Sequence, residues 1–395
     1  MSVNEAFEVV VVGGGPAGAT AADRLAREGH SVLLLDKAGR IKPCGGAIPP
    51  RLIRDFEIPA SLLCAQIKSA RMVSPSERQV DMPIDGGYVG MVNREAFDEF
   101  LRQRAAEHGA TRRTGSYERI VREPDGTAFV EYLDQEGVAQ KVKTDLVIGA
   151  DGALSKVARQ ELPDVHVPYV FAYHEILEVP ESAKRGNFDG RRADVIYDGR
   201  VSPDFYGWIF PHGDTASVGS GSAHKGLSLK QSVARLRATH GLEGFRTLRR
   251  EGAPIPLRPA KRWDNGRDVI LAGDAAGVVA PASGEGIYYA MVGGQLAAEA
   301  GLQFLETRDP KALRQARKGF MKAHGRVFWI LGIMQTFWYK NDKRRERFVS
   351  MCKDPDVQEL TWQAYMNKEL VRAKPGAHLR IFFKDMAHLL GLVSP

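Results

Sequence analysis

The pattern of apolar and small residues over residues 7–36 predicts a strand, a glycine turn, a helix and a second strand. An apolar run at 9–12 ends at three consecutive glycines. An alanine-rich helical pattern over 16–28 begins with proline, which is favoured at the first position of a helix. A second apolar run at 32–35 closes on Asp36. Short apolar runs bounded in this way are typical of buried strands in a parallel sheet.

Farther along the chain, strand and helix patterns alternate on both sides of a region dominated by strand patterns. The expected elements, in chain order, are a helix over 95–108, a strand over 142–149, several strands within 166–225, a strand over 268–272, a small-residue helix over 285–305 and helical sequence beyond 311. This order predicts an α/β nucleotide-binding domain with a sheet domain inserted into it.

The glycine turn carries the G-x-G-x-x-G spacing on Gly13, Gly15 and Gly18. In such a turn the first glycine permits the tight bend, the second lets the backbone approach a pyrophosphate, and the third lets the helix pack on the strand. The free N–H groups of the helix N-terminus attract the phosphates. Asp36, eighteen residues beyond Gly18, stands where a carboxylate accepts hydrogen bonds from a ribose diol. The segment therefore predicts a site for an adenine dinucleotide.

Composition and length favour an intracellular globular protein of two or three domains. The chain has 395 residues, 44% of them hydrophobic and 26% charged. Its acidic first residues do not resemble a signal peptide, and its longest late apolar run, 327–334, is too short to span a bilayer. Three cysteines, Cys44, Cys64 and Cys352, argue for a reducing compartment and against a structural metal. We expect a cytoplasmic protein with no metal site.

Positive charge is concentrated in the last part of the chain. The net charge is +7, but residues 311–395 carry 17 Lys and Arg against 7 Asp and Glu, a net of +10. The aromatic and basic residues that alternate there are Phe328, Trp329, Phe337, Trp338, Lys340, Lys343, Arg344, Arg345 and Arg347. Such a segment favours an anionic lipid surface as partner. A solvated helical face whose aromatics fill a core is the alternative, and no nucleic-acid recognition motif accompanies the charge.

A second turn, late in the chain, repeats the design of the first. The strand over 268–272 runs into Gly273-Asp274, and a helix starts near Gly284 and Gly286. An Asp-Gly pair at Asp151 follows the strand over 142–149, and Arg94 begins an Arg-x-x-Phe-Asp sequence before a helix. In this order the motifs resemble those of FAD enzymes of the para-hydroxybenzoate hydroxylase type.

This resemblance implies FAD and a set of residues that hold it. Asp274 would bind the ribityl chain, the helix after Gly286 would point at the isoalloxazine, and Arg94 would lie near the pyrophosphate. The full set of expected cofactor-binding residues is Gly13, Gly15, Ala17, Gly18, Asp36, Lys37, Gly45, Arg94, Val121, Asp151, Gly273, Asp274, Gly284, Gly286 and Ile287.

Two further motifs narrow the family. Pro43-Cys44-Gly45-Gly46 follows the ribose acid, and residues 203–211 match the pattern P-x-x-Y-x-W-x-F-P. The chain is thereby similar to geranylgeranyl reductases, and its tail resembles the chlorophyll and bacteriochlorophyll branch. Tyr206, Trp208 and Phe210 alternate, so a strand would project all three from one face. They form either an aromatic wall for a polyisoprenoid chain or the packed face of a sheet.

The resemblance implies reduction of the isolated double bonds of a geranylgeranyl group to phytyl. The substrate would be geranylgeranyl-(bacterio)chlorophyll, geranylgeranyl diphosphate or both, with NADPH as reductant. The alkene needs a proton as well as a hydride, and Cys44, Tyr206 or a trapped water are the candidate donors. No second dinucleotide motif of matching quality is present, and Asp36 would repel a 2′-phosphate. NADPH would therefore bind transiently at the flavin.

The expected architecture is an α/β fold: a Rossmann-type FAD-binding domain, an inserted antiparallel β-sheet substrate domain and a C-terminal helical region. The expected boundaries are 1–70, 94–165 and 268–310 for the FAD domain, 71–93 and 166–267 for the substrate domain, and 311–395 for the helices. Two other functions stay open, a flavin monooxygenase of the same fold and a non-catalytic prenyl-binding carrier. The enzyme would be cytoplasmic, with peripheral attachment to the photosynthetic intracytoplasmic membrane.

Overall fold

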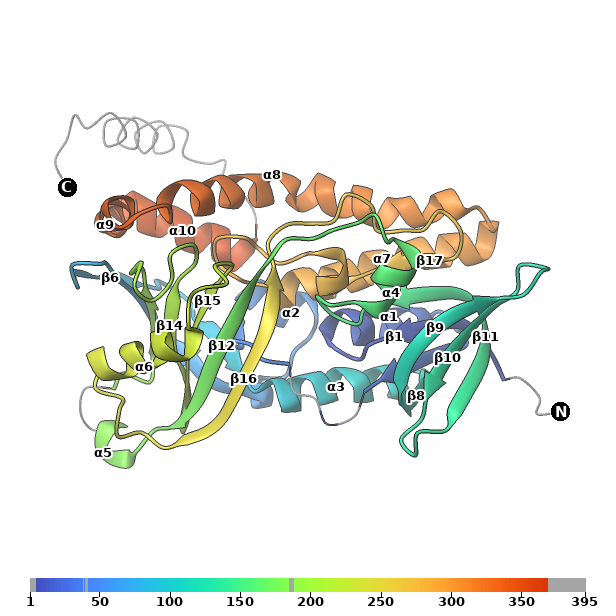
Figure 1. Ribbon diagram of the computed structural model, residues 1–395, viewed down its shortest axis with the longest axis horizontal. Coiled ribbons are helices and arrows are strands. Elements are labelled where there is room, and N and C mark those ends of the chain that lie inside the picture. Colours follow the sequence, from blue (N-terminus) through green and yellow to red (C-terminus); the bar gives the residue numbers. More distant parts are fainter. Residues whose placement is uncertain (1–4, 38, 40–41, 185–187, 369–395) are drawn as a thin grey trace. The chain divides into compact units, whose positions relative to one another are not determined.

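The computed structural model describes residues 5–37, 39, 42–184 and 188–368 (Figure 1). Two compact units are present, each assembled from three segments: Met1–Lys42, Arg94–Tyr169 and Pro254–Trp329 in the first unit, and Pro43–Asn93, Val170–Ala253 and Ile330–Pro395 in the second. This division differs from the expected domains, because residues 43–70 belong to the second unit and the region beyond 311 is split. The boundaries of the FAD-binding and substrate-binding domains therefore stay a prediction.

The first unit is built on a seven-stranded sheet with parallel central strands. β1 (Ala6–Val12) pairs in parallel with β2 (Val32–Asp36) on one side and with β11 (Ala139–Gly149) on the other. The remaining strands are β8 (Thr111–Thr114) beside β2, β10 (Ala128–Leu133) and β9 (Ser116–Arg122) beyond β11, and β17 (Val269–Leu271), parallel to β11. The predicted strand–helix–strand start and the predicted α/β fold are confirmed.

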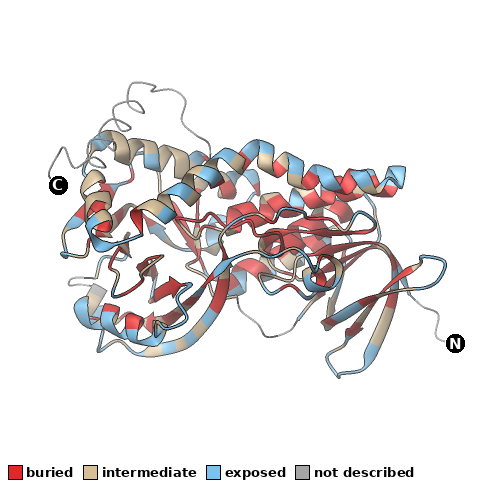
Figure 2. Ribbon diagram, turned by 45° about the horizontal axis from the view of Figure 1, so that its top comes forward, coloured by how far each residue is buried: buried red, intermediate tan, exposed pale blue. Residues whose placement is uncertain are grey.

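Helices of the first unit pack closely because small residues line their contacts. The long helices are α1 (Pro16–Arg27), α3 (Arg94–Glu107) and α7 (Ile287–Thr307); the short ones are α4 (Lys156–Glu161), η2 (Gly273–Ala276) and η3 (Pro310–Leu313). A Cβ atom on Gly294 of α7 would lie 2.1 Å from the carbonyl oxygen of Ala17 in α1. The alanine and glycine content of both helices thus permits their backbones to approach each other, and both contact faces are buried (Figure 2).

The second unit contains a seven-stranded, mostly antiparallel sheet. Its strands, in spatial order, are β16 (Thr247–Pro256), β12 (Tyr169–Glu178), β15 (Thr215–Ser222), β14 (Gly207–His212), β13 (Arg192–Ile196), β5 (Ser69–Val73) and β6 (Gln79–Pro83). Only the β13–β5 pairing is parallel among the registers that the described residues define. A small sheet of β3 (Ala47–Ile48), β7 (Val89–Val92) and β4 (Leu63–Ile67) accompanies it.

One face of the large sheet is closed by α6 (Leu229–Thr239). Val233 and Leu236 of this helix are fully buried against Ile209 and Val218 of the sheet. Arg237 at the end of α6 donates to the Glu175 carboxylate of β12 at 2.6 Å. The opposite face of the sheet is therefore the one that remains for other contacts. Three short helices, α2 (Pro50–Asp55), η1 (Ala60–Leu62) and α5 (Glu181–Lys184), lie in the connections.

In its described part, the helical region predicted over 311–395 is confirmed as α8 (Arg314–Trp338), α9 (Asp342–Met351) and α10 (Pro355–Asn367), while residues 369–395 lie outside the described residues. Arg345 of α9 is only 2% exposed. Its guanidinium donates to the carbonyl oxygens of Pro203 and Tyr339, and to the Asp342 carboxylate at 2.6 Å. The expectation that Arg345 faces a lipid surface is wrong, because this cation is occupied inside the second unit.

The aromatic residues of the region are also divided between core and surface. Phe328 and Trp338 are buried, 5% and 7% exposed, whereas Trp329 is 65% exposed. Phe328 packs edge-on against Tyr289 of α7 at a ring-centre distance of 4.9 Å. A lipid-facing role is therefore excluded for Phe328 and Trp338, while it stays open for Trp329. No helix in the described part of the chain is both long and apolar enough to cross a membrane.

Candidate functional site

The glycine turn after β1 has the geometry that a dinucleotide requires. Gly13 has a φ of +105°, a conformation that favours glycine. A Cβ on Gly18 would lie 1.8 Å from the Gly13 carbonyl oxygen, so the helix touches the turn. A Cβ on Gly15 would meet no described atom within 4 Å. The backbone at Gly15, the N-cap of α1, therefore faces open space into which a phosphate can approach.

Asp36, the predicted ribose acid, is oriented by two partners. The Gly14 amide donates to its carboxylate at 2.9 Å, and the Arg102 guanidinium lies 3.2 Å from the other oxygen. Arg102 also donates to the Gly14 carbonyl at 3.3 Å. Helix α3 thus anchors the turn through a cation, and the carboxylate keeps a fixed direction. No sequence pattern indicates Arg102, because its partner lies 66 residues away in the chain.

Asp274, the predicted ribityl acid, is paired with a lysine that the sequence analysis also missed. Its side chain is 7% exposed, and it accepts from the Lys42 ammonium group. The preceding Gly273 has a φ of +63°, and a Cβ there would lie 2.7 Å from the Cβ of Ala17. The Gly-Asp turn is thereby packed directly against the start of α1. Both predicted turns belong to one continuous structure of the first unit.

Asp151 caps a helix. Its carboxylate accepts from the Ser155 hydroxyl at 2.5 Å and from the Lys156 amide at 2.6 Å, at the start of α4. Burial raises the pKa of this carboxyl, against the hydrogen bonds, which lower it. The role predicted for Asp151 toward FAD stays a prediction, since the observed contacts are those of a helix cap.

Arg94 starts α3 and is buried with Asp98, to which it donates two hydrogen bonds of 2.8 Å each.

The other expected cofactor residues of the first unit differ in their burial and in the elements that carry them. Ala17 and Ile287 are buried at the starts of α1 and α7, Lys37 is exposed after β2, and Val121 is half-buried in β9. Gly284 has a φ of +64°, and Gly286 is the N-cap of α7. Their contacts with a cofactor stay predictions.

Three predicted carboxylates follow strands that run in the same direction. Asp36 ends β2, Asp151 follows β11 and Asp274 follows β17, and each of these strands is parallel to its neighbour in the sheet. The carboxyl ends of parallel strands are where nucleotides bind in open α/β sheets. The glycine turn after β1 lies among them. The residues present therefore fit FAD, with open backbone for phosphates and carboxylates for hydroxyl groups.

A separate predicted cluster, the aromatic face, lies in the second unit and consists of Tyr206, Trp208 and Phe210. Adjacent members have ring-centre distances of 6.1 and 6.3 Å, which confirms that they project from the same side of β14. Tyr206 and Trp208 are 7% and 6% exposed, and Phe210 is half-buried. Because Ile209 points to α6, the aromatic face lies on the opposite side of the sheet.

The Pro43-Cys44-Gly45-Gly46 loop contacts this aromatic face. A Cβ on Gly45 would lie 3.0 Å from the Phe210 ring, and one on Gly46 would lie 2.6 Å from Nε2 of His212. Gly46 also has a φ of +69°, and a Cβ there would lie 2.5 Å from the Val92 carbonyl oxygen, so this position requires glycine, whereas a side chain at Gly45 would have to displace the Phe210 ring. The structure therefore joins two motifs that are about 160 residues apart in the sequence. His212 contacts this loop from the end of β14.

Burial determines the protonation of the polar groups near the loop. Burial raises the pKa of Tyr206 far above its ordinary value, with Tyr339 and Cys44 adding to the effect, so the phenol keeps its proton. Burial lowers the pKa of His212 below 6.5, against a hydrogen bond to the Phe210 carbonyl of 3.0 Å. The imidazole is therefore neutral at neutral pH. Cys44, half-buried, accepts a weak hydrogen bond from the Gly46 amide at 3.4 Å.

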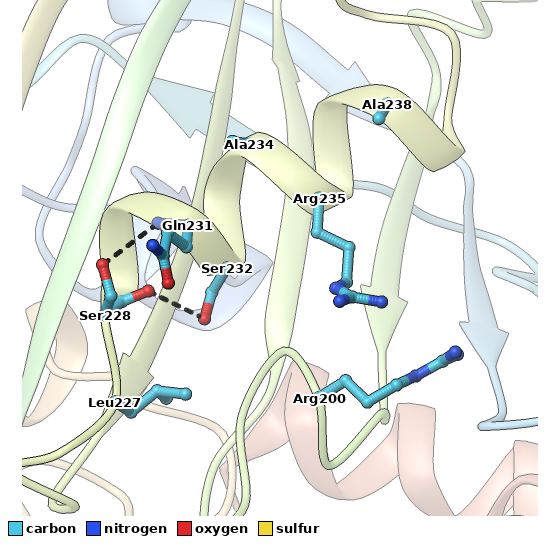
Figure 3. A pocket seen from close by; sticks show the side chains of 8 residues that line it. All are labelled: Arg200, Leu227, Ser228, Gln231, Ser232, Ala234, Arg235 and Ala238. Atoms are coloured by element: carbon cyan, nitrogen blue, oxygen red, sulfur yellow. Dashed lines mark hydrogen bonds between the residues drawn. The ribbon is translucent and has the colours of Figure 1, made fainter.

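A pocket of about 420 Å³ opens elsewhere in the second unit, beside α6 (Figure 3). It is lined by Arg200, Leu227, Ser228, Gln231, Ser232, Ala234, Arg235 and Ala238. None of the predicted site residues lines it. Within the described residues, no cluster of His, Cys, Asp and Glu has the arrangement of a metal site.

Comparison with known proteins agrees with this geometry. Residues 6–168 match the family model of an FAD binding domain. The chain is 57% identical to the geranylgeranyl diphosphate reductase of Rhodobacter capsulatus, over 98% of this chain and 99% of that one. It is 37% identical to the geranylgeranyl diphosphate reductase of Synechocystis, over 97% and 98% of the two chains.

A solved structure shares the fold over almost the whole chain. It is a geranylgeranyl bacteriochlorophyll reductase-like protein from Thermoplasma acidophilum, 22% identical, with a TM-score of 0.80 over 94% of this chain and 99% of that one. The sequence relatives match nearly end to end, and the FAD-binding match covers the glycine turn, Asp36, Arg94 and Asp151. The chain belongs to the FAD-dependent geranylgeranyl diphosphate reductase family.

Proposed function

We propose that this enzyme reduces the isolated double bonds of a geranylgeranyl group to phytyl, on (bacterio)chlorophyll or on the free diphosphate, with NADPH as reductant. The observation that carries the proposal is the aromatic face with the cysteine loop packed against it. Aromatic rings offer large apolar area with little conformational entropy to lose, which suits a flexible polyisoprenoid chain. The relatives' names support the choice of the geranylgeranyl group.

The dinucleotide site would hold FAD, which when bound supplies the hydride chemistry that such an alkene requires. Gly13, Gly15 and Gly18 would cradle the pyrophosphate, Asp36 would bind the adenosine ribose, and Asp274 would bind the ribityl chain. Lys42 already neutralises Asp274. We therefore expect Lys42 to exchange its ion pair for a contact with the cofactor or its phosphates.

Cys44 and Tyr206 would deliver the proton to the alkene carbon. Both lie in the second unit, and Cys44 is near enough to raise the pKa of Tyr206. Because its pKa is raised, the Tyr206 phenol keeps its proton throughout the working pH range. A phenol of such high pKa is a weak acid. We therefore take Cys44 as the first candidate donor, with Tyr206 and a trapped water as the alternatives.

The test is turnover of both substrates under strict anaerobiosis, with product analysis. We expect phytyl products without oxygen, and a yellow purified protein with bound flavin. Oxygen-dependent hydroxylation would indicate the monooxygenase, and a colourless protein that binds prenyl chains without reducing them would indicate the carrier. Trp208→Ala should raise KM for the prenyl substrate and leave NADPH-dependent flavin reduction nearly intact. If it abolished flavin binding instead, the aromatic face would belong to the core.

We also propose that the enzyme attaches peripherally to an anionic membrane through one stripe of α8. Trp329 and Ile333 are 65% and 47% exposed and lie one turn apart. Exposed Lys322 and Arg326 precede Trp329 on the same helix, at successive spacings of four and three residues. Interfacial aromatic residues and cations each favour binding to anionic lipid. The stripe thus replaces the broader basic tail expected from the sequence.

Liposome flotation tests this attachment. Binding to anionic vesicles should fall with salt and should weaken in the double variant Trp329→Ser with Ile333→Ser. Arg235→Gln, an exposed cation of α6, is the matched control and should bind as the wild type does. Equal indifference to anionic and neutral vesicles would leave α8 as structure only.

A further inference from the structure

Four side chains form a polar chain across four adjacent strands of the large sheet. The Trp208 indole Nε1 lies 3.1 Å from the Ser217 hydroxyl oxygen. That oxygen lies 2.9 Å from Nδ1 of His174, and Nε2 of His174 lies 3.0 Å from the Glu251 carboxylate. The strands are β14, β15, β12 and β16, which are neighbours in this order. All four residues belong to the second unit.

The directions of these hydrogen bonds follow from chemistry. An indole N–H can only donate, so Ser217 accepts from Trp208. The Ser217 hydroxyl then has its own proton to give. In the His174 tautomer that carries its proton on Nε2, Nδ1 accepts from Ser217 and Nε2 donates to the Glu251 carboxylate. The chain begins at a group of the aromatic face and ends at an anion.

Burial distinguishes this chain from a nucleophilic site. A serine, a histidine and a glutamate in series resemble the order of a hydrolytic triad. However, Ser217 is fully buried and His174 is 3% exposed, and the Ser217 oxygen is already engaged by the indole. Such a hydroxyl cannot reach a substrate carbonyl. A buried polar group is costly when it loses its partner, so the chain instead holds its members in place.

The indole is also held by a steric contact. Trp208 pairs with Gly219 of β15, and a Cβ on Gly219 would lie 2.2 Å from an indole ring atom. The same Cβ would lie 2.6 Å from the Cβ of His174. Gly219 thus provides the space that the indole fills, while Ser217 fixes the direction of its N–H. Strand β15 therefore contacts both the ring and the N–H of the indole.

We propose that His174 and Glu251 are positioning residues that act through Ser217 to fix the Trp208 indole, and that this orientation sets how far a prenyl chain enters and how many of its double bonds are reduced. The inference rests on the proposed role of the aromatic face in prenyl binding. Glu251 serves as the anchor because its carboxylate also pairs with Arg249.

The first test reads the hydrogen bond itself. Indole ¹⁵N–¹H spectra of the full-length, flavin-loaded protein should show signals from its five tryptophans, and Trp208→Phe assigns one of them. In Ser217→Ala that signal should move upfield, as for a lost hydrogen bond, while the other signals stay. Ser217→Thr, which keeps a hydroxyl, should restore it, and Glu251→Leu should shift it in part. If the Trp208 signal did not move in Ser217→Ala, the polar chain of side-chain hydrogen bonds would be refuted.

The second test is a double-mutant cycle on prenyl KM and product distribution. Ser217→Ala should raise KM about fivefold in the wild-type background, the size of one hydrogen bond. It should have no further effect in Trp208→Phe, which lacks the N–H. Gly219→Ala should mimic Ser217→Ala by displacing the ring, whereas Gly221→Ala, with more room, is the control. Additive effects in the two backgrounds would overturn the proposal.

These tests separate the inference from the function on which it rests. If Trp208→Ala left prenyl KM unchanged while the Ser217→Ala signal moved, the prenyl role of the aromatic face would be refuted and the polar chain would stand. If Trp208→Ala raised KM and the signal did not move, the face would stand and the positioning role would fall.

Discussion

At the scale of single residues, the glycines of the turn after β1 differ in whether the fold itself requires them. Gly13 and Gly18 are required by the fold itself, since one has a positive φ and the other touches backbone. Gly15 is different. Its φ is −73°, and a Cβ there would meet no described atom within 4 Å. The fold therefore does not require a glycine at this position, and we expect the space to serve the pyrophosphate of a cofactor.

Gly15→Val should consequently lose flavin without losing the fold. We expect FAD affinity to fall about tenfold or more, because the branched side chain occupies the place of a phosphate, which corresponds to ~1.4 kcal/mol or more. The flavin-to-protein ratio and the unfolding midpoint of the flavin-free protein measure the two effects. Gly226→Val, another open position, is the control and should keep its flavin. Full occupancy in Gly15→Val would refute the placement of FAD.

His212 gives a pH dependence whose sign can be derived. Burial lowers its folded-state pKa below 6.5, so under acid conditions the unfolded chain takes up a proton that the folded protein does not. Its contribution to stability is complete above about pH 6.5 and is lost as the pH falls toward the lowered folded pKa. Unfolding free energies between about pH 7.5 and 5.5 should fall less steeply in His212→Gln than in wild type. Identical slopes would contradict this assignment.

At the scale of elements, α9 contacts Pro203, the first residue of the P-x-x-Y-x-W-x-F-P motif. Arg345 donates to the Pro203 and Tyr339 carbonyls, and Tyr197 packs against Phe348 of α9 at 5.0 Å between ring centres. Tyr197 is also 6.2 Å from the ring centre of Tyr206. The helix therefore supports the aromatic face through Tyr197, whose ring packs against both Phe348 and Tyr206.

Arg345→Met should destabilise the second unit by about 2–4 kcal/mol, because two buried carbonyls lose their donor. The unfolding midpoint in denaturant measures this loss. Lys343→Gln, an exposed cation of the same helix, is the matched control and should change stability by less than about 0.5 kcal/mol. Equal effects of the two substitutions would show that Arg345 contributes no more than surface charge.

At the scale of the whole molecule, local sequence patterns predict the helices and strands. They do not predict contacts between residues that are distant in the sequence and meet only in the folded chain. The turn after β1, the strand of alternating aromatics and the helices beyond 311 follow from periodicity and turn chemistry. Lys42 and Asp274 are 232 residues apart, and no pattern indicates that they pair. Arg345 lies in a run of cations, which predicts a solvated face. Only the approach of Pro203 and Tyr339 to this residue explains its burial.

The threading of the chain between the two units has a consequence for biosynthesis. The first unit is complete once Trp329 has left the ribosome, whereas the second still lacks the segment that starts at Ile330. Segments 43–93 and 170–253 are therefore synthesised before the segment that completes the second unit. The strand of the aromatic face is translated at that point, but the helix that supports it is not. Domains generally fold as units during synthesis, and unfinished ones expose apolar surface. The order of the segments thus predicts that the first unit folds first and that the second unit is the part that depends more on chaperones.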